Sequence, residues 1–315
     1  MNKLIIATRG SKLALWQSNH IKSLIEAKHG IEVELKIIKT TGDKILDTPL
    51  ALVGGKGLFT KELEEEMLKG NAHIAVHSLK DVPTKFPDGL ILATVTKRED
   101  ARDCFLSFDY KELKELPKGA VVGTTSLRRR MQLLAVRPDL TIKDLRGNID
   151  TRITKLQNGE FDAIILATAG IKRLGIIDSV KYAAPIDKDI MVPAMGQAAL
   201  GIESVDDEKV KSIVAFLNDE NTMIETTVER AFVDALEGGC QAPIGINAEL
   251  NGSIISVKSS IGLPDASQIW NDEARFSTDE YKTAGVVFAN SLIKKGVKEL
   301  LSNACKLGEE ILSKK

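Results

Sequence analysis

The chain opens with a strand–helix–strand pattern that constrains its fold more than any other stretch. Residues 3–7 form a short apolar run typical of a buried strand, and a helix follows with Trp16, Leu24 and Ile25 on its apolar side. Apolar and polar residues then alternate over residues 31–38, as in a half-buried strand. Two strands joined by a helix form a parallel pair with a right-handed crossover. The pattern therefore predicts an α/β fold.

The same pattern continues and then changes, which indicates several domains. A charged run at residues 97–103 coincides with a restart of the α/β pattern, and the chain turns again at residues 193–197. Two such crossings suggest that a second unit is inserted into the first, with the two lobes facing one another across a cleft, as in hinged binding proteins. Asn251-Gly252 then marks a β-hairpin in a final α+β part. We predict a first α/β lobe at residues 1–96 with 197–216, a second α/β lobe at 97–196, and a C-terminal α+β domain at 217–315.

Composition indicates an ordinary soluble globular protein. Of the 315 residues 43% are hydrophobic and 28% are charged, and the net charge is −1, so nothing global recruits nucleic acid or an anionic membrane. The apolar run Leu4–Ala7 is too short for a signal peptide, and no stretch approaches a membrane span. Three distant cysteines argue against a disulfide framework. We expect a reduced, cytoplasmic protein. His73 and His77 lie on a predicted strand, so we expect no metal site.

Six arginines fall at predicted strand ends or helix starts, where side chains of an α/β sheet converge on a ligand. Any one of them is more often a solvated surface residue, but six in a nearly neutral chain predict an anion site. Guanidinium groups bind carboxylates and phosphates through paired hydrogen bonds, and so many imply a polyanion. Three hydroxyl residues nearby add neutral donors. The arginines are Arg9, Arg128, Arg129, Arg146, Arg152 and Arg173, and the hydroxyl residues are Ser11, Thr124 and Ser126.

Three further residues each allow a structural and a functional interpretation. Cys240 follows two glycines and precedes Pro243, so it is either a small, inert residue at a helix end or a thiol mounted on a loop to carry a group. Asp81 either caps a turn or accepts a hydrogen bond from substrate N–H and stabilises positive charge in the transition state. Lys56 lies in a glycine-containing loop that is either a surface connection or a lid.

Taken in order, several stretches resemble the porphobilinogen deaminase (hydroxymethylbilane synthase) family along the whole chain. The family implies three domains, of which the first two are folded like hinged periplasmic binding proteins. The matching stretches are residues 7–11, 13–17, 54–59, 77–83, 123–129, 145–148, 151–152, 169–175 and 238–245.

The resemblance implies a cofactor and a reaction. Cys240 would carry a dipyrromethane cofactor through a thioether, and the enzyme, a transferase of heme and other tetrapyrrole (porphyrin) biosynthesis, would be a monomer. It would condense four molecules of porphobilinogen head to tail, lose ammonia at each step and release the linear tetrapyrrole hydroxymethylbilane. Asp81 matches the catalytic aspartate, which would hold pyrrole N–H groups while ammonia leaves and a cationic azafulvene forms. The implied cofactor-binding residues are Lys80, Thr124, Ser126, Arg128, Arg129 and Arg146, and the implied substrate-binding residues are Arg9, Ser11, Gln17, Lys56, Arg146, Arg152 and Arg173.

Two positions depart from the family pattern. The chain has Ala198 where the family often has glycine, and Leu52 where it often has lysine, which affects expectations about the hinge and the loop but not about the activity.

Two rival functions remain open at this point. A solute-binding or ligand-sensing module would share the two lobes but leaves Cys240 and the third domain without a role. A phosphate-handling transferase would need a phosphate loop or an acidic metal cluster, and the sequence contains neither.

Overall fold

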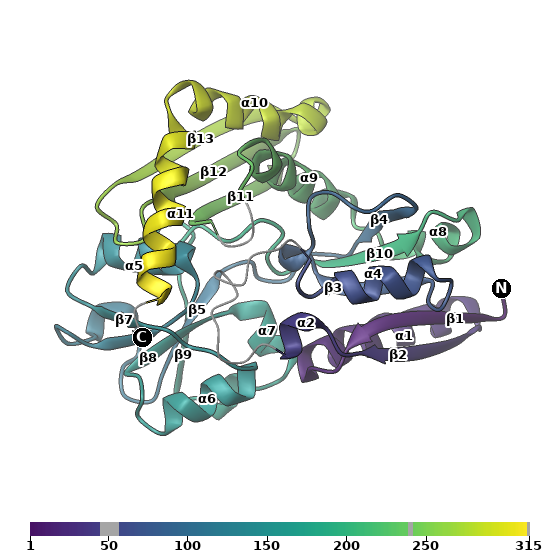
Figure 1. Ribbon diagram of the computed structural model, residues 1–315, viewed down its shortest axis with the longest axis horizontal. Coiled ribbons are helices and arrows are strands. Elements are labelled where there is room, and N and C mark those ends of the chain that lie inside the picture. The colour runs from purple at the N-terminus through teal and green to yellow at the C-terminus, as the bar shows by residue number, and fades with distance from the viewer. Residues whose placement is uncertain (45–56, 239–241, 314–315) are drawn as a thin grey trace. The chain divides into compact units, whose positions relative to one another are not determined.

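A computed structural model describes residues 1–44, 57–238 and 242–313 of the chain (Figure 1). These residues form two compact units, and each is described by itself. One unit consists of the described residues up to Glu99 together with Ala198–Met223; the other consists of Asp100–Gln197 and the described residues from Ile224 onward. Within the described part of the chain, no helix is both long and apolar enough to cross a bilayer.

The first unit is built on a five-stranded mixed sheet in the order β2-β1-β3-β10-β4. Strand β1 pairs in parallel with β2 and β3, whereas β10 runs antiparallel to β3 and β4. The carboxyl ends of β1 and β3 therefore meet at one edge of the sheet. The strands are β1 Lys3–Arg9, β2 Glu32–Ile38, β3 Ile74–Ser78, β4 Leu90–Val95 and β10 Leu200–Val205.

Helices cover both faces of this sheet. Ile21 and Ile25 of α1 join an apolar cluster with Leu4 and Ile6 on one face, and Leu63 of α4 belongs to a separate cluster with other residues of the sheet. The longer helices are α1 Lys12–His29, α4 Lys61–Leu68 and α8 Glu208–Val214, with short turns α2 Thr41–Lys44, η1 Leu79–Asp81 and η4 Ala215–Leu217.

The buried side of α1 is shifted by about one position from the predicted one, although Ile25 is buried as predicted. Trp16 and Leu24 are 38% and 37% exposed, whereas Gln17 and Ser18 are buried. Both buried polar residues are satisfied by hydrogen bonds, since Ser18 Oγ donates to Thr8 Oγ1 at 2.7 Å and Gln17 donates to a strand residue described below. Hydrogen-bonded polar side chains can thus replace apolar ones on a buried helix face.

The second unit begins with another five-stranded sheet, in the order β7-β6-β8-β5-β9. Strands β6, β7 and β8 are parallel, and β5 runs antiparallel to both β8 and β9. The sequence did not predict β5 or β9. The strands are β5 Asp103–Ser107, β6 Val121–Gly123, β7 Thr141–Lys143, β8 Ala163–Ala167 and β9 Tyr182–Pro185, and the helices are α5 Leu127–Val136, α6 Ile149–Gln157, α7 Thr168–Arg173, η2 Leu113–Glu115 and η3 Ile177–Ser179.

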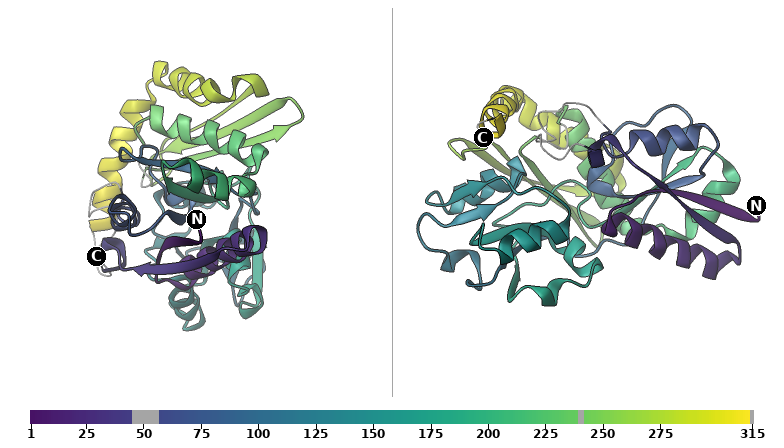
Figure 2. Two further views of the ribbon diagram at one scale, coloured as in Figure 1. Left: turned by 90° about the vertical axis from the view of Figure 1, so that its right-hand side faces the viewer. Right: turned by 60° about the horizontal axis from the view of Figure 1, so that its bottom comes forward.

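The C-terminal part of the second unit is an antiparallel three-stranded sheet with helices (Figure 2). Its predicted hairpin is confirmed, with Gly252 at a φ of 64° in the turn. From the sequence we also expect one helical stretch at roughly residues 279–312. The structure has two helices there, because Gly296, at a φ of 98°, interrupts the stretch. The sheet and all three helices share one apolar cluster. The elements are α9 Glu220–Ala235, β11 Ile244–Asn251, β12 Ile254–Gly262, β13 Ile269–Ser277, η5 Thr278–Glu280, α10 Tyr281–Lys294 and α11 Val297–Ser313.

Two α/β lobes and a C-terminal α+β part confirm the predicted fold class. The three predicted domain limits stay a prediction.

Candidate active site

The first half-site lies at the carboxyl ends of β1 and β3. Arg9 is the last residue of β1, and Ser11 is the N-cap of α1, where its Oγ accepts a hydrogen bond from the Ala14 N–H. Arg9 donates to both carboxylate oxygens of Asp43 and lies 3.9 Å over the Phe59 ring. A carboxylate and an aromatic ring thus fix the guanidinium of Arg9 in orientation.

Asp43 is strongly held as a carboxylate. Burial acts to raise its pKa, but hydrogen bonds from Arg9 and Thr40 outweigh this effect, and the pKa lies below its ordinary value. Thr40 supplies both its main-chain N–H, at 3.3 Å, and its hydroxyl, at 2.8 Å. Asp43 therefore stays ionised at neutral pH and keeps Arg9 paired.

Asp81 lies on the one-turn helix η1 that directly follows β3, and its side chain is exposed. Lys80 beside it is half-buried. Gln17, from α1, is 2% exposed and donates from Nε2 to Ser78 Oγ at 2.9 Å. This bond connects Gln17, a predicted substrate-binding residue, to β3, the strand that directly precedes the turn with Asp81.

The second half-site begins where β6 ends and α5 starts. Thr124 is buried and accepts a hydrogen bond from the Ser126 N–H at 3.2 Å, while Ser126 Oγ caps α5 by accepting from the Arg129 N–H. Thr125 Oγ1 donates to the Leu145 carbonyl, which joins this turn to the segment after β7. The sequence predicts that residues 124–126 cap a helix that runs from Leu127 to about Val136, and the structure confirms this cap.

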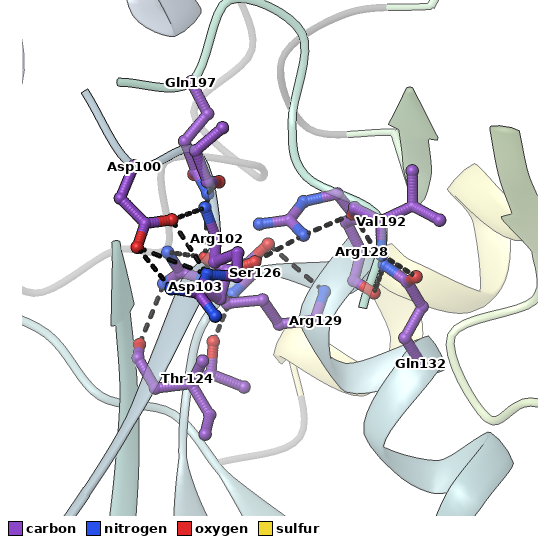
Figure 3. Close-up of polar contacts among 12 residues, drawn as sticks. Asp100, Arg102, Asp103, Thr124, Ser126, Arg128, Arg129, Gln132, Val192 and Gln197 are labelled. Carbon is purple, nitrogen blue, oxygen red and sulfur yellow. Dashed lines mark hydrogen bonds and ion pairs between the residues drawn. The ribbon is translucent and has the colours of Figure 1, made fainter. Parts of the chain in front are cut away.

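Arg128 and Arg129, in the first turn of α5, converge on the buried carboxylate of Asp103 (Figure 3). Arg128 Nη1 donates to Asp103 Oδ2 at 2.7 Å, and Arg129 donates to Oδ1 from Nε at 3.0 Å and from Nη2 at 2.7 Å. Gln197 Nε2 also donates to Oδ1, at 3.1 Å. Burial lowers the pKa of Arg129, and the Asp103 charge opposes that shift.

Three more predicted arginines lie on the segments that follow β7 and β8. Arg146 is half-buried, and its Nη1 is enclosed without a hydrogen-bond partner among the described residues. Arg152, on α6, donates from Nε to the Gly147 carbonyl at 2.8 Å. Arg173 is the last residue of α7, so it lies one helix away from the strand end at which the sequence placed it.

The structure therefore groups the predicted residues into two sets, one in each unit. Because β7, β6 and β8 are neighbours, the segments that carry Arg146, Arg128 and Arg173 leave the same edge of one sheet. The segments that carry Arg9 and Asp81 leave one edge of the other sheet. Cys240 and Lys56 lie outside the described residues, as does Leu52.

Sequence reasoning missed four residues around these arginines. Asp103, Asp43 and Phe59 contact arginines directly, and Gln197 contacts Asp103. Asp103 ends the charged run that we interpreted as a domain crossing, and its burial was not predicted, although the side chain is fully buried. The apolar stretch Cys104–Leu106 directly after it is a signal of a strand that could have shown that the run ends there.

The two histidines considered as metal ligands have other partners. His77 Nε2 lies 3.0 Å from Glu203 Oε2 in a buried pair, and His73 Nδ1 accepts a hydrogen bond from the Ile5 N–H. Over residues 1–44, 57–238 and 242–313, no group of three or more histidine, cysteine or acidic side chains could hold a metal ion.

Comparisons with known proteins identify the family. Residues 4–212 match the family model "Porphobilinogen deaminase, dipyromethane cofactor binding domain", and residues 223–294 match "Porphobilinogen deaminase, C-terminal domain". The chain is 64% identical over 304 residues to porphobilinogen deaminase of a Nitratiruptor species, covering 96% of this chain and 97% of that one. It is 60% identical over 306 residues to porphobilinogen deaminase of Sulfurimonas denitrificans, covering 96% and 98%.

Among solved structures, the methionine-binding protein MetQ aligns with a TM-score of 0.44 and 14% identity, over 70% of this chain and 92% of that one. The two family models together span most of the sequence, and the relatives match nearly end to end. The chain belongs to the porphobilinogen deaminase family.

Proposed function

We propose that this chain joins four molecules of porphobilinogen head to tail into hydroxymethylbilane, with loss of ammonia at each condensation, on a dipyrromethane cofactor attached to Cys240. The reaction and the cofactor follow from membership of the family, whose first model is named for the dipyrromethane-binding domain. One observation in this structure supports the proposal most. In the second half-site two arginines share one carboxylate, and a nitrogen of a third arginine has no hydrogen-bond partner among the described residues.

The donor set of the second half-site fits a dipyrromethane. Each pyrrole of such a cofactor carries an acetate and a propionate arm, which are carboxylates that guanidinium groups bind well. Arg128, Arg129 and Asp103 together carry one net positive charge in a buried place. Arg146 adds an enclosed Nη1 that has no partner in the described part of the chain. When bound, the cofactor supplies the free pyrrole carbon on which the chain of product grows.

In the second lobe, each residue has a binding task under this proposal. Arg128, Arg129 and Arg146 hold carboxylate arms, and the hydroxyls of Thr124 and Ser126 donate to the remaining carboxylate oxygens. Because both hydroxyl oxygens already accept main-chain N–H bonds, their O–H groups are left to donate. Arg152 and Arg173 bind the arms of the lengthening product. Lys80, from the first lobe, also contacts the cofactor.

In the first lobe, Arg9, Ser11 and Gln17 receive the incoming porphobilinogen. The pairing of Arg9 with Asp43 and its stacking on Phe59 fix the direction of its guanidinium, which reduces the entropy lost when a carboxylate binds. Lys56 also contributes to substrate binding.

Asp81 is the catalytic residue of the proposal. Its carboxylate holds the pyrrole N–H of porphobilinogen and offsets the positive charge that develops as the amine departs. An exposed carboxylate at the end of β3 is accessible to a substrate, and its main-chain position is fixed because the Val82 N–H donates to the Leu79 carbonyl. Charge stabilisation of this kind contributes about 10² to 10³ in rate.

The matched pair Asp81→Asn and Asp88→Asn tests this assignment. Asp88 is an exposed acid on the segment between β3 and β4, so its loss changes the net charge equally. We expect Asp81→Asn to lower turnover of porphobilinogen by about 10²-fold or more and Asp88→Asn to leave it unchanged. Near-normal turnover in Asp81→Asn would remove Asp81 from its role.

Other expectations about the protein complete the proposal. We propose that it works as a cytoplasmic monomer, with porphobilinogen as its small-molecule partner and without nucleic acid, membrane or metal. The three domains follow the limits predicted from the sequence.

A further inference from the structure

The buried carboxylate of Asp103 is the centre of the second half-site. The side chain of Asp103 has no exposed surface, and its two oxygens accept hydrogen bonds from Arg128, Arg129 and Gln197 (Figure 3). The side chains of Arg128 and Arg129 are themselves only 5% and 8% exposed. A buried acid with this many charge-assisted bonds determines where both guanidinium groups lie.

The strand directions explain how Asp103 reaches the site. Parallel strands β6 and β8 bring their carboxyl ends to the edge where α5 begins, whereas β5 is antiparallel to β8, and its first residue, Asp103, lies opposite Ala167 at the end of β8. Because β5 is antiparallel to β8, the first residue of β5, and not its last, lies at the edge of the sheet where α5 begins. Gln197 fixes the other side of the carboxylate, since its Nε2 also donates to the Ala101 carbonyl at 2.7 Å.

The two arginines use their donors differently. Arg129 commits all three nitrogens, to Asp103 and to the Ile165 carbonyl. Arg128 commits only Nη1, to Asp103 and to the Val192 carbonyl, and its Nε and Nη2 make no hydrogen bond within the described part of the chain. Arg128 is thus fixed at one nitrogen and presents the other two to a ligand.

The charges of this cluster do not cancel. Two guanidinium groups face one carboxylate, and Gln197 is neutral, so one positive charge remains in a place where uncompensated charge is costly. An anionic ligand arm would remove that cost. The cluster therefore favours an anion without giving up its internal pairing.

We propose that Asp103, supported by Gln197, is a positioning residue that fixes Arg128 and Arg129 for a carboxylate arm and leaves one positive charge for that arm to neutralise. The assignment of a cofactor arm as this carboxylate rests on the proposed function, whereas the positioning and the charge do not. Asp103 acts through the two arginines and need not touch the ligand.

The test uses the full chain with Cys240→Ala, so that no covalent cofactor is present, and combines it with Asp103→Asn, Asp103→Glu or Gln197→Met. Asp162→Asn is the matched control, because Asp162 is an acid of the same lobe that accepts from the Val121 N–H at 2.6 Å and pairs with no arginine in the described residues. The melting temperature is measured against the concentration of succinate, a dicarboxylate probe, at constant ionic strength.

We expect Asp103→Asn to have the lowest melting temperature without succinate and the smallest rise with it, because Arg128 and Arg129 are then no longer held in the direction in which they bind a carboxylate. Asp103→Glu should restore most of the starting behaviour, and Asp162→Asn should show the same succinate dependence as the parent. A parallel, succinate-independent decrease in Asp103→Asn would mean a merely structural role and overturn the proposal. If Asp103→Asn shows no cooperative unfolding, Gln197→Met decides the question. A succinate dependence of its melting temperature that differs from that of the parent would support the proposal, and an unchanged dependence would overturn it.

Loading of the cofactor gives a second readout, by intact mass, in chains that keep Cys240. The fraction of Asp103→Asn that carries the dipyrromethane mass should fall roughly tenfold relative to Asp162→Asn, since a charge-assisted contact is worth about that factor. Equal loading of the two variants would contradict the proposal. If even the unchanged protein carried no added mass, the proposed function would fail, but the succinate experiment would still decide the role of Asp103.

Discussion

Replacing Asp43 with asparagine tests how the first half-site holds Arg9. The carboxylate accepts two hydrogen bonds from Arg9 and two from Thr40. Asparagine keeps one acceptor oxygen and removes the charge, so at least one charge-assisted bond to the guanidinium is lost. Such bonds contribute about 1.5 to 3 kcal/mol. Because the two side chains are still 22% and 21% exposed, we expect the free energy of unfolding to fall by about 1 to 2 kcal/mol.

The effect has a definite pH dependence. Burial acts to raise the pKa of Asp43, but the bonds from Arg9 and Thr40 leave it below its ordinary value. Stabilisation by a group with a lowered pKa is present above the unfolded pKa, about 3.9 for aspartate, and is lost as the pH falls through the folded pKa. The difference between the protein and Asp43→Asn should therefore be full at pH 7 and shrink below about pH 4.

Thermal unfolding followed by circular dichroism over this pH range measures the effect. A loss of 1 kcal/mol corresponds to a decrease in melting temperature of about 2 to 4 °C for a folded unit of this size. Glu34→Gln, which removes an acid from an exposed pair with Lys3, should change the melting temperature much less. The Michaelis constant for porphobilinogen should also rise in Asp43→Asn, because Arg9 loses its fixed direction. Equal melting temperatures at pH 7, or a difference that grows as the pH falls below about 4, would refute this reasoning.

Three other outcomes follow from the structure. Ala198 has a φ of 78°, which is unfavourable for a residue with a Cβ, so Ala198→Gly should raise the free energy of unfolding by about 0.5 to 1 kcal/mol in denaturant titrations; a decrease would contradict this. A Cβ on Gly285 would lie too close to the Val228 carbonyl oxygen of α9, so Gly285→Ala should lower the free energy of unfolding by about 1 to 3 kcal/mol. An unchanged melting temperature would count against the close packing of α9 and α10. Burial raises the pKa of Cys104 to about 12, so iodoacetamide at pH 8 should modify this thiol only after denaturation. Mass spectrometry of the peptides measures the modification, and labelling of Cys104 in the native protein would exclude a buried thiol.

The sequence predicted elements well where local signals determined them. Helix α5 has the predicted bounds, Leu127–Val136, because Ser126 provides a cap directly before an amphipathic run. From the sequence we also expect a strand at residues 90–95, and β4 has these bounds, Leu90–Val95. The fold class was equally accessible, since it depends on the order of strands and helices.

What the sequence did not predict depends on partners distant along the chain. Asp103 can be buried because partners distant along the chain pair with its charge, among them Arg128 and Arg129, which lie 25 and 26 positions later. Gln17 is buried only because Ser78 accepts its hydrogen bond across 61 positions. A polar residue in a sequence indicates exposure unless such a partner is known, so the burial of Asp103 and that of Gln17 on α1 were missed for the same reason. The roles of the site residues, in contrast, came from the family resemblance and stay predictions.

The intact mass of the purified protein tests the central claim most directly. If a dipyrromethane on Cys240 primes the reaction, the protein should exceed the mass of its sequence by one dipyrromethane, and Cys240→Ala should have the mass of its sequence alone and no turnover. A fully active protein with no added mass, or an added mass that persists in Cys240→Ala, would contradict it.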